Sequence, residues 1–468
     1  MRRILALGLL LALTSLEATA NPLVNPPGNV VTRVESTSRL WTLSSRIQMR
    51  RARGPIVDRY SFYSPTQPAM TDAPAIGFPE HTFVHPMVVE SSSSIAYPDM
   101  AFLRVLQRDP YLGERTIVPD LKPIRDVLVT NASTLTHAGE HAVGTIELRV
   151  PELAQRIIDF ESDLRVRTWE TDIDEFAADA IDWPVDGYPA ELQRYLGEEM
   201  FVDPEAQEMH EIVGHCLGEN PGETNRPYAL AKRLAACVMT ALTVTETEYE
   251  WRLETEGGGQ CIRAHFTVDS SGRWTLTDFQ QGVETPTRVL MTRERERRIG
   301  EGPVVTGSVE TARRGIGTGH DAAALMVALF RRAGLPARLV VGLDTERQRQ
   351  YSPSNALVLR TWCEFALYDE DRGVVEWVPV DVARQLETSS RVPPLDRVWP
   401  YFGRHEGLDT TIPLSFHFVL PDTESPLIRP GLWGYRGKLA MPPMTTDIEF
   451  EAHTPSKRGD DPPDPYAP

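Results

Sequence analysis

The sequence has no apolar run long enough to cross a membrane as an α-helix. Its charged start, Met1–Arg3, is followed by the apolar segment Ile4–Leu13 and by Ala18-Thr19-Ala20. That segment holds about ten residues, whereas a membrane-spanning helix needs roughly 20. A charged start, a short apolar core and small residues before a cleavage point are typical of a secretory signal peptide. We therefore expect residues 1–20 to be a signal peptide and the protein to be exported to the periplasm or the extracellular space, without a transmembrane segment.

Cysteine is scarce, with four residues in a chain of 468: Cys216, Cys237, Cys261 and Cys363. Their spacings contain none of the close Cys-x-x-Cys pairs that bind structural zinc. In an oxidising compartment an even number of cysteines permits up to two disulfides, with three connectivities. Buried, unpaired cysteines are the alternative, and the sequence does not decide between the two.

Basic residues are outnumbered, since 48 Lys and Arg stand against 66 Asp and Glu and the formal net charge is -18. An acidic surface repels the phosphates of nucleic acids and of anionic membranes. We therefore exclude nucleic acid as a main partner, whereas a protein or peptide partner is compatible with the composition. A chain of this length is expected to form roughly two or three domains.

The sequence also lacks the His-Glu-x-x-His pattern of zinc hydrolases. His137 and His141 are close in sequence, as are His210 and His215, but neither pair has the spacing and the glutamate of that pattern. Histidines five residues apart on a helix also point in different directions. The sequence therefore argues against a metal-dependent hydrolase, and we expect neither a metal nor another cofactor.

Residues 21–190 show the alternation of apolar and polar side chains that is typical of β-strands. The clearest examples are Leu40–Met49, His141–Val150 and Asp163–Thr171, where apolar residues recur at every second position. Long segments rich in Pro, Ser and Thr also occur here, as expected of loops. We predict a β-rich N-terminal domain that ends near residue 190.

Beyond residue 190 the pattern changes to helices. Apolar residues recur at helical spacing over 192–196, 206–217 and 228–240. Residues 248–280 then alternate again and contain two glycine-rich turn signals, which predict a three-stranded meander inserted in the second domain.

The clearest helix covers Asp321–Ala333, where apolar residues repeat at helical spacing. Asp321 suits the positive N-terminal end of the helix, and Gly334 and Pro336 end it.

Three predicted strands follow this helix, over Ala337–Leu343, Leu357–Tyr368 and Val374–Val380. A helix followed by several strands indicates an α+β fold. We expect residues 426–468 to form a C-terminal extension, with a disordered tail from about residue 453 because the last residues are rich in proline and charge.

Three motifs in the second domain resemble the bacterial transglutaminase-like superfamily. They are Glu310–Arg338 (ETARRGIGTGHDAAALMVALFRRAGLPAR), Arg360–Glu364 (RTWCE) and Trp377–Asp381 (WVPVD). The resemblance extends over about residues 190–420, and we place the domain at residues 191–425. It implies a papain-like core in which a helix packs on an antiparallel sheet, preceded by the β-rich domain.

Members of this family carry a catalytic cysteine at the N-terminus of the long helix, in a pattern of Gly-x-Cys-x-Asp type, where the helix end lowers the thiol pKa. Here Gly319 stands at the cysteine position, and Asp321 keeps the acidic residue. The family histidine lies two residues before a strand tryptophan, but Arg360 precedes Trp362 in this sequence. The aspartate that orients the histidine matches Asp381. The resemblance therefore implies that one of three catalytic positions is retained.

Our first hypothesis is a protein that is inactive in Cys/His acyl transfer and acts as a binding or structural module in the cell envelope. An arginine stays protonated in proteins and cannot serve as a general base. Because a buried carboxylate needs a partner, this hypothesis predicts an ion pair between Arg360 and Asp381.

Our second hypothesis is an acyl-transfer enzyme of the transglutaminase, amidase or peptidase type with a displaced nucleophile. Cys363 is the candidate nucleophile, although strand alternation points it away from the cleft if Arg360 and Trp362 point into it. His320 and His405 are the candidate bases, and Trp362 would line the cleft and contact substrate.

Overall fold

The computed structural model describes the chain in segments that cover both predicted domains. The described residues are 28–51, 81–88, 90–109, 113–116, 122–123, 143–150, 157–218, 226–244, 247–253, 262–268, 274–280, 292–293, 305–346, 359–389, 391–421, 423–424, 433–437 and 444–454. The predicted signal peptide, Cys261, the His137–His141 segment and the tail beyond residue 454 lie outside them.

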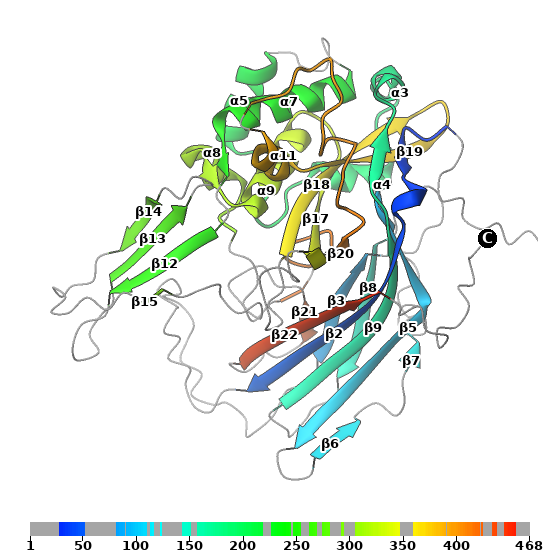
Figure 1. Cartoon of the computed structure of the whole chain (residues 1–468), viewed down its shortest axis with the longest axis vertical. Helices are drawn as coiled ribbons and strands as arrows, with labels where there is room; N and C mark the ends of the chain where they lie inside the picture. Colours follow the sequence, from blue (N-terminus) through cyan, green and yellow to red (C-terminus); the bar gives the residue numbers. More distant parts are fainter. Residues whose placement is uncertain are drawn as a thin grey trace, which may run out of the picture.

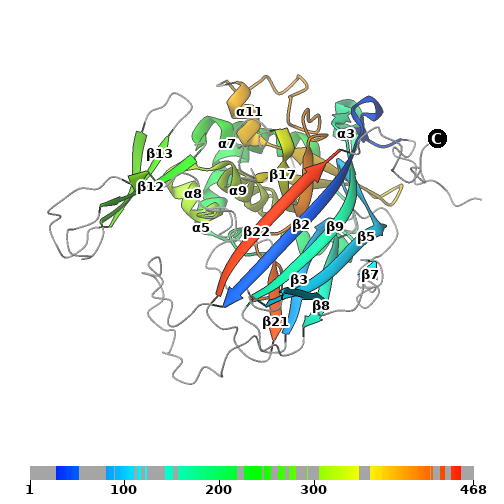
Figure 2. The same ribbon diagram turned by 60° about the horizontal axis from the view of Figure 1, so that its bottom comes forward.

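The first part of the chain, together with two strands from its far end, forms two antiparallel sheets that pack face to face (Figures 1 and 2). Their strands are β2 Arg39–Arg51, β3 His81–Val88, β4 Glu90–Ser91, β5 Ser94–Asp109, β6 Gly113–Thr116, β7 Lys122–Pro123, β8 Val143–Val150, β9 Ile157–Thr168, β21 Gly434–Gly437 and β22 Met444–His453. The larger sheet has the order β22-β2-β9-β5-β4, with β6 and β7 paired to β5, and the smaller has the order β21-β3-β8. The predicted β-rich N-terminal domain is therefore present.

Strand β2 shows why this sequence forms a sandwich. Trp41, Ile47 and Met49 are buried, and the residues between the buried positions are partly exposed, as expected of a strand with one face on a core. Across that core, Phe83 of β3 stacks on Phe160 of β9 with 3.7 Å between ring centroids. The apolar positions of the alternating sequence thus face the interior of the sandwich.

The predicted C-terminal extension contributes two strands to this sandwich. Strand β22 pairs with β2 along its whole length, and β21 pairs with β3. Ile448 and Phe450 of β22 are buried in the sandwich core. The expectation of a separate extension is therefore wrong for these strands, because the edge of the large sheet is completed by residues from the far end of the chain.

The second part of the chain is a set of helices packed on a four-stranded antiparallel sheet (Figure 1). The helices are α3 Glu175–Ala180, α4 Ala190–Gln193, η3 Arg194–Leu196, α5 Gln207–Leu217, α7 Pro227–Ala241, α8 Ser308–Arg314, α9 Gly319–Arg332 and α11 Val382–Thr388. The sheet contains β17 Ala337–Asp344, β18 Leu359–Asp369, β19 Val374–Val380 and β20 Thr411–Ser415, in the order β19-β18-β17-β20. No helix in the described residues is both long and apolar enough to span a membrane.

Helix α9 is the centre of this domain. Of its 14 residues, 11 are buried, and Phe330 of α9 lies against Phe365 of β18 with 5.2 Å between ring centroids. A helix that is apolar on nearly all sides is expected to be covered on all sides, and α5, α7, α8 and α11 contact it opposite the sheet. The fold is α+β with a papain-like core, as the sequence predicts.

The described chain also contains one short helix and two short strand pairs outside the large sheets. They are η1 Glu35–Thr37, the antiparallel pair β1 Val31–Arg33 and β10 Thr171–Ile173, and the parallel pair β11 Thr243–Val244 and β16 Ile316–Gly317. The predicted three-stranded meander is a separate sheet at one side of the molecule (Figure 1), and a fourth strand, β15, extends it in the order β14-β13-β12-β15. Its strands are β12 Thr247–Leu253, β13 Ile262–Val268, β14 Trp274–Gln280 and β15 Thr292–Arg293.

One disulfide joins the helices above α9. Cys216 at the end of α5 is bonded to Cys237 in α7, and Cys363 is a free, buried thiol. The structure therefore selects one pairing from those that the sequence left open.

The two domains meet at a buried ion pair. Arg338 of β17 donates to Glu364 of β18, with 2.6 Å between Nη2 and Oε2, and both side chains are at most 1% exposed. The other carboxylate oxygen of Glu364 accepts hydrogen bonds from the backbone N–H and the hydroxyl of Ser92, in the turn between β4 and β5. The guanidinium lies between the rings of Trp377 and Phe416, 3.9 and 3.8 Å from their centroids. The β-sandwich thus supplies hydrogen bonds to a buried ion pair that lies in the second domain.

Candidate functional site at the N-terminus of helix α9

Helix α9 begins with a capping box that involves Thr318 and Asp321. The hydroxyl of Thr318 accepts from the N–H of Asp321, and the Asp321 carboxylate accepts from the N–H of Thr318 at 3.0 Å. The same carboxylate accepts from the N–H of Thr306 at 2.7 Å and from that of Gly307. Asp321 is 1% exposed, and its role is to fix the segment before α9 to the helix end.

Gly319 is the first residue of α9, at the position that the family resemblance assigns to a cysteine. A β-carbon added at Gly319 would lie 3.5 Å from the β-carbon of Ala383 in α11, which is ordinary van der Waals contact. Its backbone lies outside the left-handed region. Neither space nor conformation therefore demands glycine here, and a side chain at this position would face α11.

Arg360 of β18 and Asp381 at the N-cap of α11 form the ion pair predicted from the sequence. Both Nε and Nη2 of Arg360 donate to Oδ2 of Asp381, at 2.9 and 2.8 Å. The other carboxylate oxygen accepts from the N–H of Arg384 at 2.8 Å and so caps α11. Burial acts to raise the pKa of Asp381, but the Arg360 charge and the hydrogen bond from the N–H of Arg384 hold it well below its usual range.

His405 completes this cluster. Its side chain is fully buried, and its Nδ1 lies 2.9 Å from the carbonyl oxygen of Glu406. Because a carbonyl only accepts, Nδ1 carries the proton and Nε2 accepts from Nη2 of Arg360 at 3.2 Å. Burial lowers the pKa of His405. The imidazole is therefore neutral and already engaged by the guanidinium, so its accepting nitrogen is not free to take a proton from a substrate.

The profile of the transglutaminase-like superfamily matches residues 287–382. That range contains α9, Gly319, Arg360 and Asp381. This part of the chain is a transglutaminase-like domain.

Other comparisons are more distant. The chain is similar to a solved structure from Cytophaga hutchinsonii that is described as a candidate cysteine protease, with 11% identity and a TM-score of 0.41. The similarity covers 89% of this chain and 91% of that one. No curated protein matches the sequence.

Cys363 lies on β18, inside the transglutaminase-like domain. Its side chain is 1% exposed and belongs to the main hydrophobic core, and its Sγ lies 3.3 Å from the carbonyl oxygen of Val380. Burial raises the pKa of the Cys363 thiol well above its ordinary value, and the charges of Asp381 and Glu364 act in the same direction. The thiol is therefore protonated and unreactive.

Trp362 does not line an open cleft of the transglutaminase-like domain, so this expectation is wrong. Its side chain is 0% exposed and packs with Val88, Val340, Leu408 and Phe416. Strand alternation puts Trp362 on the same face of β18 as Glu364, and that face is covered by the β-sandwich. Trp362, which the family motif places two residues after the histidine position, here lies in the contact between the two domains.

His320 lies beside Gly319 and is oriented by β18. Its Nδ1 lies 2.7 Å from the hydroxyl of Thr361, and its ring packs edge-on against Phe418 with 6.4 Å between ring centroids. Burial lowers the pKa of His320. Thr361 was not identified from the sequence, although alternation on β18 places it on the face opposite Arg360.

Two further residues near this site escaped the sequence analysis. Phe201 and Tyr401 have φ angles of 72° and 65°, in the left-handed region that non-glycine residues rarely adopt. The carbonyl oxygen of Tyr401 accepts from the N–H of Asp381, and the ring of Phe201 packs on Phe418, which contacts His320. Nothing in the spacing of the sequence signals such backbone conformations.

The described part of the chain holds no group of three His, Cys, Asp or Glu side chains placed to bind a metal. His210 and His215 are exposed on α5, and the His137–His141 segment is not among the described residues.

Proposed function

We propose that this is an exported protein whose transglutaminase-like domain binds a protein or peptide in the cell envelope and does not catalyse Cys/His acyl transfer. The observation that carries the proposal is the ion pair between Arg360 and Asp381, at the place where the superfamily holds its histidine and aspartate. The guanidinium satisfies the carboxylate that would otherwise orient a general base.

The chemistry of the site supports this proposal. Gly319 offers no atom that can attack a carbonyl group, and Arg360 cannot accept a proton at physiological pH. Loss of the nucleophile or of the base from a catalytic triad lowers the rate by about a thousand-fold to a million-fold. The remaining thiol of the described domain, Cys363, is buried in the core.

The retained shape of the site supports a binding role. Phe201 and Tyr401 hold unfavourable φ angles, and each such angle costs about 1–3 kcal/mol. Backbone strain of this kind persists where the surrounding structure enforces it, and it is common at ligand sites. A protein or peptide partner is compatible with this site, and export follows from the signal peptide that the sequence predicts.

The direct test is an assay of the purified mature protein for amide hydrolysis and for amine incorporation into glutamine-containing peptides. We expect no turnover above background from the wild-type protein or from Cys363→Ser. The matched comparison is the double variant Gly319→Cys/Arg360→His, which restores a thiol and an imidazole beside Asp381. Wild-type turnover that disappears in Cys363→Ser would refute the proposal, and periplasmic or extracellular recovery of the processed chain tests the export.

A displaced acyl-transfer enzyme is the second candidate, and one contact favours it. The hydroxyl of Thr361 lies within hydrogen-bond distance of His320, whose imidazole is kept neutral by burial and stands at a helix N-terminus. A hydroxyl paired with a neutral base is the arrangement of a nucleophilic enzyme. Thr361→Val removes the hydroxyl at nearly equal volume, so any wild-type activity that survives this change rules the second candidate out.

A further inference from the structure

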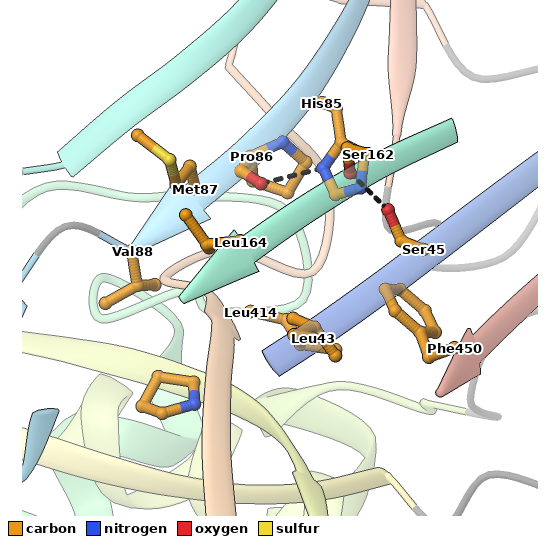
Figure 3. Close-up of a pocket in the computed structure, with 11 residues that line it drawn as sticks. Leu43, Ser45, His85, Pro86, Met87, Val88, Ser162, Leu164, Leu414 and Phe450 are labelled. Atoms are coloured by element: carbon orange, nitrogen blue, oxygen red, sulfur yellow. Dashed lines mark hydrogen bonds between the residues drawn. The ribbon is translucent and has the colours of Figure 1, made fainter. Parts of the chain in front are cut away.

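The pocket between the two sheets of the β-sandwich is too small to bind a partner (Figure 3). Its wall includes Leu43, Phe450, His85 and the hydrogen-bonded pair of Ser45 and Ser162. Its enclosed space is about the size of one water molecule. We therefore look for a second binding site on the surface of the described chain.

Helix α3 presents a phenylalanine to solvent. The side chain of Phe176 is 88% exposed, which is uncommon for a large apolar residue. The opposite face of α3 is fixed to α7, because Oε1 of Glu175 accepts from the hydroxyl of Tyr228 and from Nζ of Lys232, both at 2.7 Å. Ala178 of α3 is fully buried. Phe176 is therefore held outward by a helix that is anchored on its other side.

Two more apolar side chains lie on the loop after α11, which passes beside α3. Leu395 and Val398 are 46% and 47% exposed. The lysine that binds α3 also binds this loop, since Nζ of Lys232 donates to the carbonyl oxygen of Arg397 at 2.6 Å, and both views show the loop next to α3 (Figures 1 and 2). Exposed apolar side chains that gather in one place mark interaction sites. We call Phe176, Leu395 and Val398 the α3 patch.

The chain around Phe176 is acidic. Between Arg167 and Arg194 it contains eight Asp and Glu residues and neither Lys nor Arg. Three aspartates of this stretch that are close to Phe176 in sequence are exposed, namely Asp172, Asp174 and Asp179. The α3 side of the patch therefore carries negative charge.

Nearby cations offset this charge only in part. Arg226 is already paired with Asp182, with 2.9 Å between Nε and Oδ1. On the loop after α11, the exposed Arg397 is preceded by the exposed Asp396. The surroundings of the α3 patch thus keep an excess of carboxylates, which attract cationic groups and repel anionic ones.

We propose that the α3 patch is a docking surface for a partner protein or peptide in which a large apolar side chain is flanked by Lys or Arg. The apolar side chain of the partner contacts Phe176, Leu395 and Val398, and removal of these surfaces from water supplies affinity. The flanking cations lie against the exposed aspartates of α3, and this charge complementarity speeds association and excludes acidic segments.

A second copy of this chain is a poorer occupant. A symmetric contact places the same surface of both copies face to face, so two α3 patches would bring like charges together, which is unfavourable. The α3 patch shares no residue with the site at the N-terminus of α9. The inference is therefore separate from the proposed function.

The test measures binding of a synthetic peptide to the purified mature protein by isothermal titration calorimetry. The probe has two Lys-Lys-Leu-Lys units, and the comparison peptides replace Leu by Ser or Lys by Glu. We expect saturable binding of the Lys/Leu peptide, at least about fivefold tighter than that of the Lys/Ser peptide because the leucines become buried. The Glu/Leu peptide should not bind.

Two variants with matched controls locate the binding site. Phe176→Ser should weaken binding of the Lys/Leu peptide by about tenfold, whereas Met200→Ser, at a side chain that is 60% exposed outside the α3 patch, should not. Asp179→Asn should weaken binding by about two- to fivefold and reduce its salt dependence, whereas Glu451→Gln on β22 should not. Because all four positions are exposed, the variants should keep the melting temperature of the wild type.

Three results would overturn the proposal. Equal binding of the Lys/Leu and Lys/Ser peptides would show attraction by net charge alone. Unchanged binding in Phe176→Ser, or an equal loss in Met200→Ser, would place the peptide elsewhere. A dimer of the peptide-free wild type in analytical ultracentrifugation that Phe176→Ser converts to a monomer would assign the α3 patch to a second copy of the chain.

Discussion

Arg360 donates two hydrogen bonds to one carboxylate oxygen of Asp381, and its Nη2 also donates to the buried His405. The side chains of Arg360 and Asp381 are 14% and 3% exposed. This arrangement keeps the buried Asp381 carboxylate ionised and partnered.

Replacing Arg360 by methionine should destabilise the protein. The change leaves the Asp381 carboxylate buried without a counter-charge, and removal of one partner of a buried pair costs about 3–5 kcal/mol. We expect the decrease in the free energy of unfolding to lie near the lower end of this range, because Arg360 keeps some contact with solvent. Urea denaturation of both single variants and of Arg360→Met/Asp381→Asn gives the coupling energy, with the exposed Arg404→Met as control. A coupling energy near zero would mean that the pair does not stabilise the fold.

Two glycines at the start of α9 should respond in opposite ways to alanine. Gly319→Ala is accommodated, and it should raise the free energy of unfolding by up to about 1 kcal/mol because it restricts the unfolded chain. A β-carbon at Gly317 would lie 2.7 Å from that of Asp321, so Gly317→Ala should cost about 1–3 kcal/mol. Thermal and urea denaturation of both variants measures the contrast, and equal effects would contradict the described packing.

Stability should fall as the pH drops from about 6.5 to about 4, because burial lowers the pKa of His85 from 6.5 to about 4. Between pH 6.5 and 4 the unfolded chain binds a proton at His85 that the folded protein does not bind. The contribution of neutral His85 to the free energy of unfolding is therefore complete above pH 6.5 and is lost progressively below it. A shift of this size corresponds to about 3 kcal/mol. His85→Leu should flatten the measured dependence of unfolding free energy on pH in this window. Because the pKa of Asp381 is depressed, its contribution is lost only at lower pH, below its ordinary value of 3.8.

The three described cysteines should differ in reactivity. Native protein should not react with iodoacetamide at Cys363, because the thiol is buried and protonated, whereas unfolding in urea should expose it to rapid labelling. Reduction of the Cys216–Cys237 disulfide, which closes a loop across a sequence separation of 21, should lower stability by about 3 kcal/mol. Mass spectrometry of labelled peptides and denaturation with and without reductant provide the measurements. Fast native labelling of Cys363 would reopen the case for it as a nucleophile.

The buried pair of Arg338 and Glu364 should couple the stabilities of the two domains. Glu364→Gln leaves the guanidinium of Arg338 without a counter-charge and should cost about 3 kcal/mol or more. Ser92→Ala, on the β-sandwich side, removes only one hydroxyl contact and should cost about 1 kcal/mol. Calorimetry should show a single transition for the wild type, and separate transitions for Glu364→Gln if the pair joins the domains.

Local sequence patterns were sufficient for most elements. The helical repeat at Asp321–Ala333 corresponds to α9, and the alternating segments Leu40–Met49 and Asp163–Thr171 correspond to β2 and β9, because period and burial face are properties of a short stretch of chain. The three strands predicted after the helix correspond to β17 to β19. The Arg360–Asp381 pair was also predicted from the sequence, because the family resemblance assigns both residues to one site and a buried carboxylate needs a partner.

Tertiary structure decided what depends on residues far apart in the chain. The sequence itself determined the α+β class and the position of α9, and it holds Gly319 and Arg360 where the family resemblance implies a nucleophile and a base. Only the fold brought β22 to the edge of the first sheet, buried Trp362 under the β-sandwich, and placed His405 on Arg360. The reason is physical: periodicity reports which face of an element is apolar, whereas the identity of the element that covers that face is set by packing across the whole chain.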